Sequence, residues 1–219
     1  SDEQVNALVR GLLDAGVTYF DTAPAYGVSE ERLGRALSPR PAQVVISTKV
    51  GEVFENGVSE YRFDAAHVRA SVATRAARLG APRDIVLIHA PADDVAVLAE
   101  SEAVASLVAL RAEGLIRAIG LSGKTPRAAE LALDWADAIM IEYHSRDRSH
   151  EDVIAAARRA DVGVIVKKGL ASGELPADEA IRFVLSNPDV DSLVIGGLSL
   201  EHFAANAEVA AEVAQSKRC

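Results

Sequence analysis

The chain has 219 residues, of which 49% are apolar and 25% charged, the balance of an ordinary soluble globular protein. Its net charge of −9 at pH 7 argues against a broad surface for nucleic acid or an anionic membrane, although a local basic pocket can still bind an anionic cofactor. The single cysteine, Cys219, excludes a disulfide framework, and with no membrane-length apolar run or signal peptide the chain is predicted to be cytoplasmic.

Helix and strand patterns alternate along the whole chain. The helix patterns are marked by apolar residues three or four apart, by capping residues at their starts or by glycines at their ends. They fall at about 5–15, from 29 onward, at 64–79 and 101–113, from 125 and from 149 onward, between 168 and 188, and from 199 onward. Seven segments rich in Val and Ile are predicted strands, at about 18–23, 44–49, 84–89, 116–122, 138–144, 163–168 and 192–196. The stretch at 51–60 is predicted to be a loop.

This alternation predicts a parallel sheet covered by helices. The strands are short and apolar on both faces, as parallel strands are when helices cover them. Repeated strand–helix units give either a (β/α)8 barrel or a doubly wound open sheet. The number of strands favours the barrel, but the chain opens on a helix, so the first of eight strands is predicted to be missing. We expect residues 1–219 to form a single (β/α)8 TIM barrel domain that lacks this strand.

Four side chains that can move protons come at or just after predicted strand ends. Asp21, Lys49 and His89 fall at the C-terminal ends of strands, where such barrels build their active sites, and Tyr26 follows in a loop. Reduction of a carbonyl by hydride needs a proton for the oxygen, and a free tyrosine with a pKa of about 10 is a weak donor near neutrality. We expect the Lys49 ammonium to lower the pKa of Tyr26, Asp21 to pair with Lys49, and His89 to donate a hydrogen bond to the substrate oxygen.

Each of these residues has a structural explanation when taken alone. Asp21 can cap a turn, Tyr26 can be a half-buried loop tyrosine, and His89 can be a core histidine with its hydrogen bonds satisfied. Lys49 is harder to explain in this way, because a lysine that faces a barrel interior is costly unless it is paired. The combination of all four favours a catalytic site.

The lysines and glycines near strand ends predict an anion site. Four of the five lysines, Lys49, Lys124, Lys167 and Lys168, lie at or just past strand ends. One of the adjacent pair must point outward, because neighbouring strand residues face opposite sides. Gly196 and Gly197 precede a helix N-terminus, a place where barrels often seat a phosphate. Gly123 lies in a second glycine-bearing strand exit.

The local sequences around the four candidate residues resemble those of the aldo-keto reductases. The matching strings are Phe20-Asp21-Thr22-Ala23, Tyr26-Gly27, Ser47-Thr48-Lys49 and Ile88-His89. The resemblance implies NAD(P)H-dependent carbonyl reduction with Asp21, Tyr26, Lys49 and His89 as catalytic residues. It also implies a set of cofactor contacts: Ser122, Gly123, Glu142, Lys168, Gly169, Leu170, Gly196, Gly197 and Asn206.

Three positions depart from the family pattern. Met140 stands where many members have a glutamine against the nicotinamide carboxamide, and Gly196 and His202 stand where many have Lys and Arg against the 2′-phosphate of NADP. NADP(H) is therefore favoured over NAD(H) only because the resembled family commonly uses it.

Three functions are compatible with the sequence. The preferred one is an oxidoreductase that acts on a small-molecule carbonyl, without a nucleic-acid or membrane partner. One alternative is a catalytically weak protein of the same type with a binding or regulatory role. The other is a barrel isomerase or lyase that uses Lys49 as a base or Schiff-base amine. The five histidines include no pair four residues apart, so no metal site is expected, and the sequence does not indicate the substrate or the oligomeric state.

Overall fold

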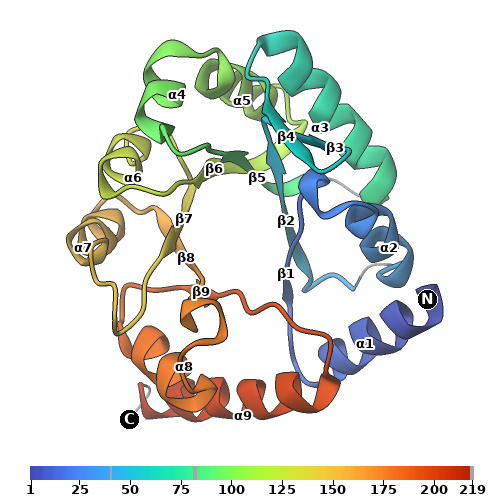
Figure 1. Cartoon of the computed structure of the whole chain (residues 1–219), viewed down its shortest axis with the longest axis vertical. Helices are drawn as coiled ribbons and strands as arrows, with labels where there is room; N and C mark the ends of the chain where they lie inside the picture. The colour runs from blue at the N-terminus through green and yellow to red at the C-terminus, as the bar shows by residue number, and fades with distance from the viewer. Residues whose placement is uncertain (40, 81–82, 218–219) are drawn as a thin grey trace.

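The computed structural model describes residues 1–39, 41–80 and 83–217, and Cys219 lies outside them. Its main sheet has seven parallel strands that curl around a centre, with helices outside (Figure 1). The strands are, in spatial order, β1 (Tyr19–Asp21), β2 (Val45–Val50), β5 (Arg83–His89), β6 (Ile116–Ser122), β7 (Ala138–Glu142), β8 (Gly163–Lys167) and β9 (Ser192–Leu193). The α-helices of the described residues are α1 (Asp2–Asp14), α2 (Ser29–Ala36), α3 (Ala65–Leu79), α4 (Asp94–Glu100), α5 (Ala103–Ala112), α6 (Pro126–Ala132), α7 (Glu151–Arg159), α8 (Ala177–Ser186) and α9 (Leu200–Ser216). The predicted barrel with one strand fewer than eight is confirmed.

The sheet is open between β1 and β9, and helices cover that side. In the part of the chain that is described, the sheet order ends at β1 on one side and at β9 on the other. Helix α9 runs along this side from α8 to α1 (Figure 1). A Cβ atom on Gly11 of α1 would lie 2.4 Å from Cδ2 of Leu200, so α1 packs closely on α9 because residue 11 is a glycine. The ring of helices is thus closed where the sheet is not.

The strands bury apolar side chains on both faces of the sheet, one facing the helices and the other facing the interior. Val86 and Ile88 of β5 belong to the large cluster that the strands share with the surrounding helices. Leu87 lies between them in sequence and belongs to a smaller cluster with Met140 and Ile165. Because successive strand residues point to opposite faces, this smaller cluster fills the interior of the curled sheet.

The stretch at 51–60, predicted as a loop, is an antiparallel hairpin of β3 (Glu52–Glu55) and β4 (Val58–Tyr61). Its turn residues Asn56 and Gly57 have φ values of 51° and 81°. Two positive φ values in succession are typical of the type I′ turn that an Asn-Gly pair favours. The loop prediction was therefore wrong at a place where the sequence carried a hairpin signal.

Two further elements differ from the prediction. Helix α4 was not predicted; it is capped by Asp93, whose carboxylate accepts a hydrogen bond from the backbone N–H of Ala96 at 3.3 Å. The strand expected at 192–196 covers only Ser192–Leu193, because β9 has a neighbour on one side only.

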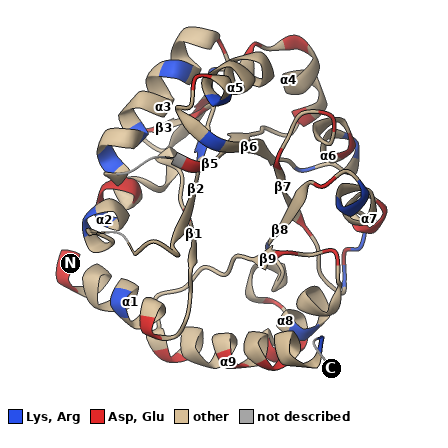
Figure 2. Ribbon diagram, turned by 180° about the vertical axis from the view of Figure 1, so that it is seen from behind, with Lys and Arg blue, Asp and Glu red and all other residues tan. Residues whose placement is uncertain are grey.

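Charged residues are spread around the outer ring, with Lys and Arg interspersed among Asp and Glu on most helices (Figure 2). Among the residues that are placed, no helix combines the length and the apolar character needed to span a membrane.

Candidate active site

Six polar residues lie at the C-terminal ends of the strands and face the interior of the sheet. We call them the polar layer: Asp21 on β1, Lys49 on β2, His89 on β5, Ser122 on β6, Glu142 on β7 and Lys167 on β8. Four of them follow a member of the inner apolar cluster by two positions, as strand periodicity requires for residues on one face. The other two, Lys49 and Ser122, contact members of the layer directly. The interior therefore changes from apolar to polar where the strands end.

Lys49 is a buried ammonium held by oxygen acceptors. Its side chain is 2% exposed, and its Nζ lies 2.5 Å from Oδ2 of Asp21. The same nitrogen donates to the carbonyl oxygen of Thr22 at 3.0 Å, and the Ser47 hydroxyl donates to Oδ1 of Asp21. Burial lowers the pKa of Lys49, and the carboxylate of Asp21 opposes this shift. The structure brings Asp21 and Lys49 together as the sequence predicted.

Tyr26 ends the short 3-10 helix η1 (Pro24–Tyr26), and its ring lies over Lys49. The distance from Nζ of Lys49 to the ring centroid is 5.2 Å, and Tyr26 is 50% exposed. Burial of the phenol and then the charges of Asp21 and Glu52 raise the pKa of Tyr26 to about 12. The expected lowering by Lys49 is not observed, because Asp21 balances that ammonium while two carboxylates act on the phenol. Tyr26 is therefore protonated at neutral pH.

His89 lies against Glu52, which the sequence analysis had left in a loop. Nδ1 of His89 is 2.5 Å from Oε2 of Glu52, although the contact lacks regular hydrogen-bond geometry. The Ser59 hydroxyl donates to the other oxygen of Glu52 at 2.6 Å. Burial lowers the pKa of His89 to about 4, with Glu52 opposing and the charges of Lys49 and Lys167 adding to the shift. His89 is therefore neutral at pH 7, and the β3–β4 hairpin supplies a carboxylate to the site.

Lys167 is the inward-facing member of the Lys167–Lys168 pair, which the sequence could not decide. Its Nζ donates to the hydroxyl of Ser122 at 3.0 Å, and its side chain is partly buried. The position follows from strand alternation, since Lys167 comes two residues after Ile165 of the inner cluster. The residues alone left the pair undecided, and the family resemblance implied Lys168 as a cofactor contact.

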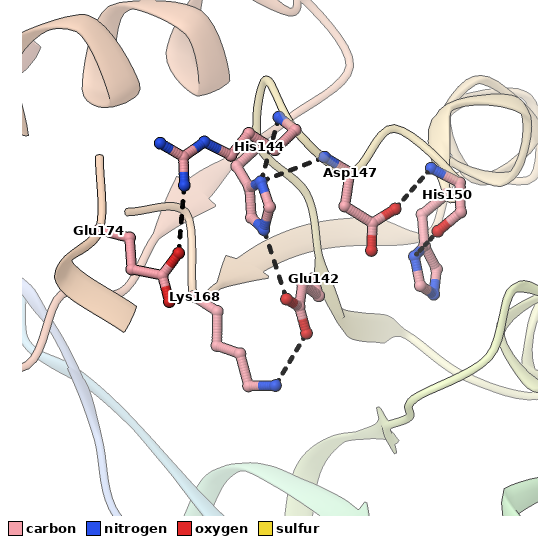
Figure 3. Close-up of polar contacts among 8 residues, drawn as sticks. Glu142, His144, Asp147, His150, Lys168 and Glu174 are labelled. Atoms are coloured by element: carbon pink, nitrogen blue, oxygen red, sulfur yellow. Dashed lines mark hydrogen bonds and ion pairs between the residues drawn. The ribbon is translucent and has the colours of Figure 1, made fainter. Parts of the chain in front are cut away.

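Lys168 does not share the orientation of Lys167 and lies at the exposed edge of the polar layer. Its φ of 54° breaks the alternation of β8, and its side chain is 54% exposed. Its Nζ contacts Oε2 of Glu142 at 2.8 Å, and the other oxygen of Glu142 lies 3.4 Å from Nε2 of His144 (Figure 3). Glu142 thus connects the polar layer to an outer chain of charged residues.

The remaining predicted cofactor residues lie in the segments that leave β6, β8 and β9. Gly123 follows Ser122, and the loop after it is fixed by Asp94, whose Oδ2 accepts hydrogen bonds from the backbone N–H groups of Lys124 and Thr125 at 2.7 and 2.8 Å. Leu170 ends the turn after β8 and begins the 3-10 helix η2 (Ala171–Gly173). Gly169 must be small, because a Cβ there would lie 2.6 Å from a methyl of Leu193.

The segment after β9 leads into α9 and leaves open space. A Cβ on Gly196 would meet no atom within 4 Å, whereas one on Gly197 would lie 3.2 Å from the ring of Phe203. The Ser199 side chain caps α9 by accepting from the N–H of His202 at 3.3 Å. Asn206 lies in the second turn of the same helix and is partly buried. Backbone N–H groups, a helix N-terminus and lysines on nearby strand ends form a donor set suited to a phosphate-bearing ligand.

Among the described residues, no group of three or more His, Cys, Asp or Glu side chains is arranged to hold a metal ion.

Comparison with known sequences assigns the chain to a family. The family model described as "Aldo/keto reductase family" matches residues 1–180. The chain is 31% identical to a D-threo-aldose 1-dehydrogenase of a Pseudomonas species over 211 residues, which covers 83% of this chain and 64% of that protein. It is also 31% identical to an NADH-specific methylglyoxal reductase of Escherichia coli over 185 residues, covering 74% of this chain and 56% of the relative. The chain thus spans less than two thirds of the length of these two curated relatives.

Comparison with solved structures gives the same fold. A crystal structure of a candidate aldo-keto reductase from Pseudomonas aeruginosa matches with a TM-score of 0.93 and 39% identity, covering 98% of this chain and 85% of the other. An aldo-keto reductase from Klebsiella pneumoniae in complex with NADPH matches with a TM-score of 0.74 and 22% identity over 99% of this chain and 84% of that one, a likeness of fold. On the strength of the family match over most of its length, this chain belongs to the aldo/keto reductase family.

Proposed function

We propose that the protein is an NAD(P)H-dependent oxidoreductase that reduces aldehydes or ketones to alcohols. The observation that carries the proposal is the grouping of Tyr26 and Lys49 at the strand ends, with the ammonium 5.2 Å from the phenol ring. The carboxylate of Asp21, 2.5 Å from the Lys49 nitrogen, favours the charged form of that ammonium inside the protein. Family membership supports an oxidoreductase, and the catalytic roles of these residues are part of the proposal.

Tyr26 is the proposed proton donor. With a pKa of about 12 it is protonated at neutral pH, and although it is a weaker acid than free tyrosine it can protonate the carbonyl oxygen, because the alkoxide that forms there is a stronger base than the phenolate. The phenolate that results is stabilised by the nearby Lys49 ammonium, which Asp21 and the carbonyl of Thr22 hold in place. Because Tyr26 is half exposed, water can return the proton for the next turnover.

His89 is the proposed orienting residue. Its Nδ1 faces Glu52, which leaves Nε2 as the ring nitrogen that can donate to the substrate oxygen when the His89–Glu52 pair holds two protons. A neutral imidazole in this place avoids a third positive charge beside Lys49 and Lys167.

The residues at the rim fit a nicotinamide dinucleotide. When bound, the cofactor supplies the hydride that reduces the carbonyl carbon. The open space at Gly196, the N-terminus of α9 and the exposed ammonium of Lys168 are suited to its phosphates, and Ser122 and Gly169 are proposed neighbours of its nicotinamide half. Asn206, Leu170 and Glu142 complete the proposed contacts. Gly196 has room for the close backbone approach that a phosphate needs, whereas Gly197 packs against Phe203.

NADP(H) is proposed as the preferred cofactor over NAD(H), on family resemblance. One of the relatives is named as NADH-specific, so both cofactors belong in the test. The proposed substrates are small aldehydes or ketones, in line with the sugar and methylglyoxal named for the two relatives.

The direct test is a titration with NADPH and, separately, with NADH. Trp135 is the single tryptophan, and quenching of its emission reports binding together with the emission of the nicotinamide itself. We expect saturable binding with a Kd in the micromolar range and consumption of the reduced cofactor when an aldehyde is added. Cofactor binding without turnover of any carbonyl would favour the alternative of a binding or regulatory protein.

A further inference from the structure

Lys167 is the member of the polar layer for which the proposed reaction has no use. Its Nζ donates to the neutral hydroxyl of Ser122 at 3.0 Å. Among the residues that the structure describes, no carboxylate lies within 4.0 Å of it, whereas Lys49 and Lys168 each pair with one. Lys167 is thus a partly buried ammonium without a counter-anion.

The surroundings of Lys167 are electropositive. Burial and then the charges of Lys49, Lys168 and Lys124 lower its pKa to about 8, and Glu142 opposes them. A buried ammonium among like charges is unfavourable unless an anion joins it. Such an anion would lie in the polar layer, within electrostatic reach of Lys49 and His89, which is where the carbonyl of the substrate is proposed to react.

We propose that Lys167 binds the carboxylate of a substrate that carries both a carbonyl and a carboxylate group. The proposal rests on the reductase function proposed above, since it uses the same site. One ammonium without a carboxylate partner matches a singly charged carboxylate, while a phosphate dianion is usually held by several donors at once. The phosphates of the cofactor have their own proposed donors at Lys168 and the Gly196–Gly197 segment, outside the polar layer.

The experiment compares aldehydes that carry a carboxylate with their neutral methyl esters. Succinate semialdehyde and 4-carboxybenzaldehyde serve as probes of different length, and kcat/KM is measured for each acid and each ester. The variants are Lys167→Met and, as a control with the same loss of charge one residue away, Lys168→Met. Thermal unfolding checks that each variant folds, and Lys167→Gln replaces Lys167→Met if the latter does not.

We expect the acid-to-ester ratio of kcat/KM to fall at least about tenfold in Lys167→Met, the size expected for the loss of a hydrogen bond to a charged group. The ratio should change less than about twofold in Lys168→Met, because its proposed contact with a cofactor phosphate is the same for the acid and the ester. An unchanged ratio in Lys167→Met would overturn the proposal. A tenfold rise in the Kd for NADPH in Lys167→Met, with equal losses of kcat/KM for the acid and the ester, would also overturn it. That result would assign Lys167 to cofactor binding.

A calorimetric titration with the product analogue 4-(hydroxymethyl)benzoate separates this proposal from the reductase function. If the native protein neither binds NADPH or NADH nor reduces any aldehyde, the proposed function fails. In that case, binding of the carboxylate that is lost in Lys167→Met still supports the anion site, and absence of binding to the native protein overturns it.

Discussion

Oε2 of Glu52 lies 2.5 Å from Nδ1 of His89, although the two residues belong to different sheets. Two atoms that both present lone pairs repel at this distance, so the contact is favourable when the pair holds a proton. If His89 is neutral with that proton on Nδ1, its Nε2 is an acceptor, and donation from Nε2 requires the pair to bind a second proton. The protonation of His89 is therefore coupled to a residue of the β3–β4 hairpin.

Stability should depend on pH through His89. Its pKa falls from an ordinary 6.5 to about 4 on folding, so the unfolded chain binds a proton more readily between these values. The free energy of unfolding should therefore decrease as the pH falls from about 6.5 to 4, by at most about 1.4 kcal/mol per pH unit from this residue. Urea unfolding at pH 7, 6 and 5 should show a shallower decrease for His89→Gln than for the native protein. Parallel curves would contradict the assignment.

The Asp21–Lys49 pair should show strong energetic coupling. Removing one partner leaves the other charge buried without compensation, so Asp21→Asn and Lys49→Met should each lower the free energy of unfolding by about 3–5 kcal/mol. The double variant should lose much less free energy of unfolding than the sum of the two single losses. The exposed pair Glu142–Lys168 is the control, with an expected coupling below about 1 kcal/mol. Additive losses at Asp21 and Lys49, measured by urea unfolding, would show that the pair is not coupled.

A second buried carboxylate should stabilise the strand that carries Lys49. Glu30 on α2 is fully buried and accepts a hydrogen bond from the Thr48 hydroxyl at 2.6 Å. It also lies 3.3 Å from Nε of Arg75 and 3.1 Å from Nη1 of Arg78. Glu30→Gln should cost about 3–5 kcal/mol, because two cations lose their shared anion. Its neighbour Glu31, which is partly exposed and pairs with Arg78, is the matched control, and Glu31→Gln should cost less than about 1 kcal/mol in the same unfolding assay.

The sequence predicted the fold and the inward residues wherever a strand was long and periodic. Asp21 and His89 end β1 and β5, so an active site at the strand ends could be proposed without coordinates. Strand alternation also requires that one of Lys167 and Lys168 faces the interior, but the register of β8 was needed to tell which one. The seven strands of the main sheet, as the described residues show them, could be predicted from the alternation of strand and helix patterns.

The partners and pKa values of the site residues could not be predicted, because they depend on contacts between segments that are distant in the sequence. Glu52 meets His89 because the hairpin folds back over the strand ends, and its Asn56-Gly57 turn was overlooked in the sequence. The pKa of Tyr26 was expected to fall beside Lys49 and instead rises, because burial and the two carboxylates of Asp21 and Glu52 outweigh an ammonium that is already paired. The direction of such a pKa shift depends on burial and on several charges at once, and only the three-dimensional structure shows these.

The central claim is that Tyr26 gives the proton in carbonyl reduction, and its removal tests this claim most directly. Aldehyde reduction is measured at saturating NADPH for the native protein, Tyr26→Phe and the control Tyr61→Phe, which removes an exposed phenol from the hairpin. We expect kcat to fall about 10²–10⁴-fold in Tyr26→Phe, the usual contribution of a general acid, while the Kd for NADPH changes little. Full turnover by a folded Tyr26→Phe protein would contradict the account.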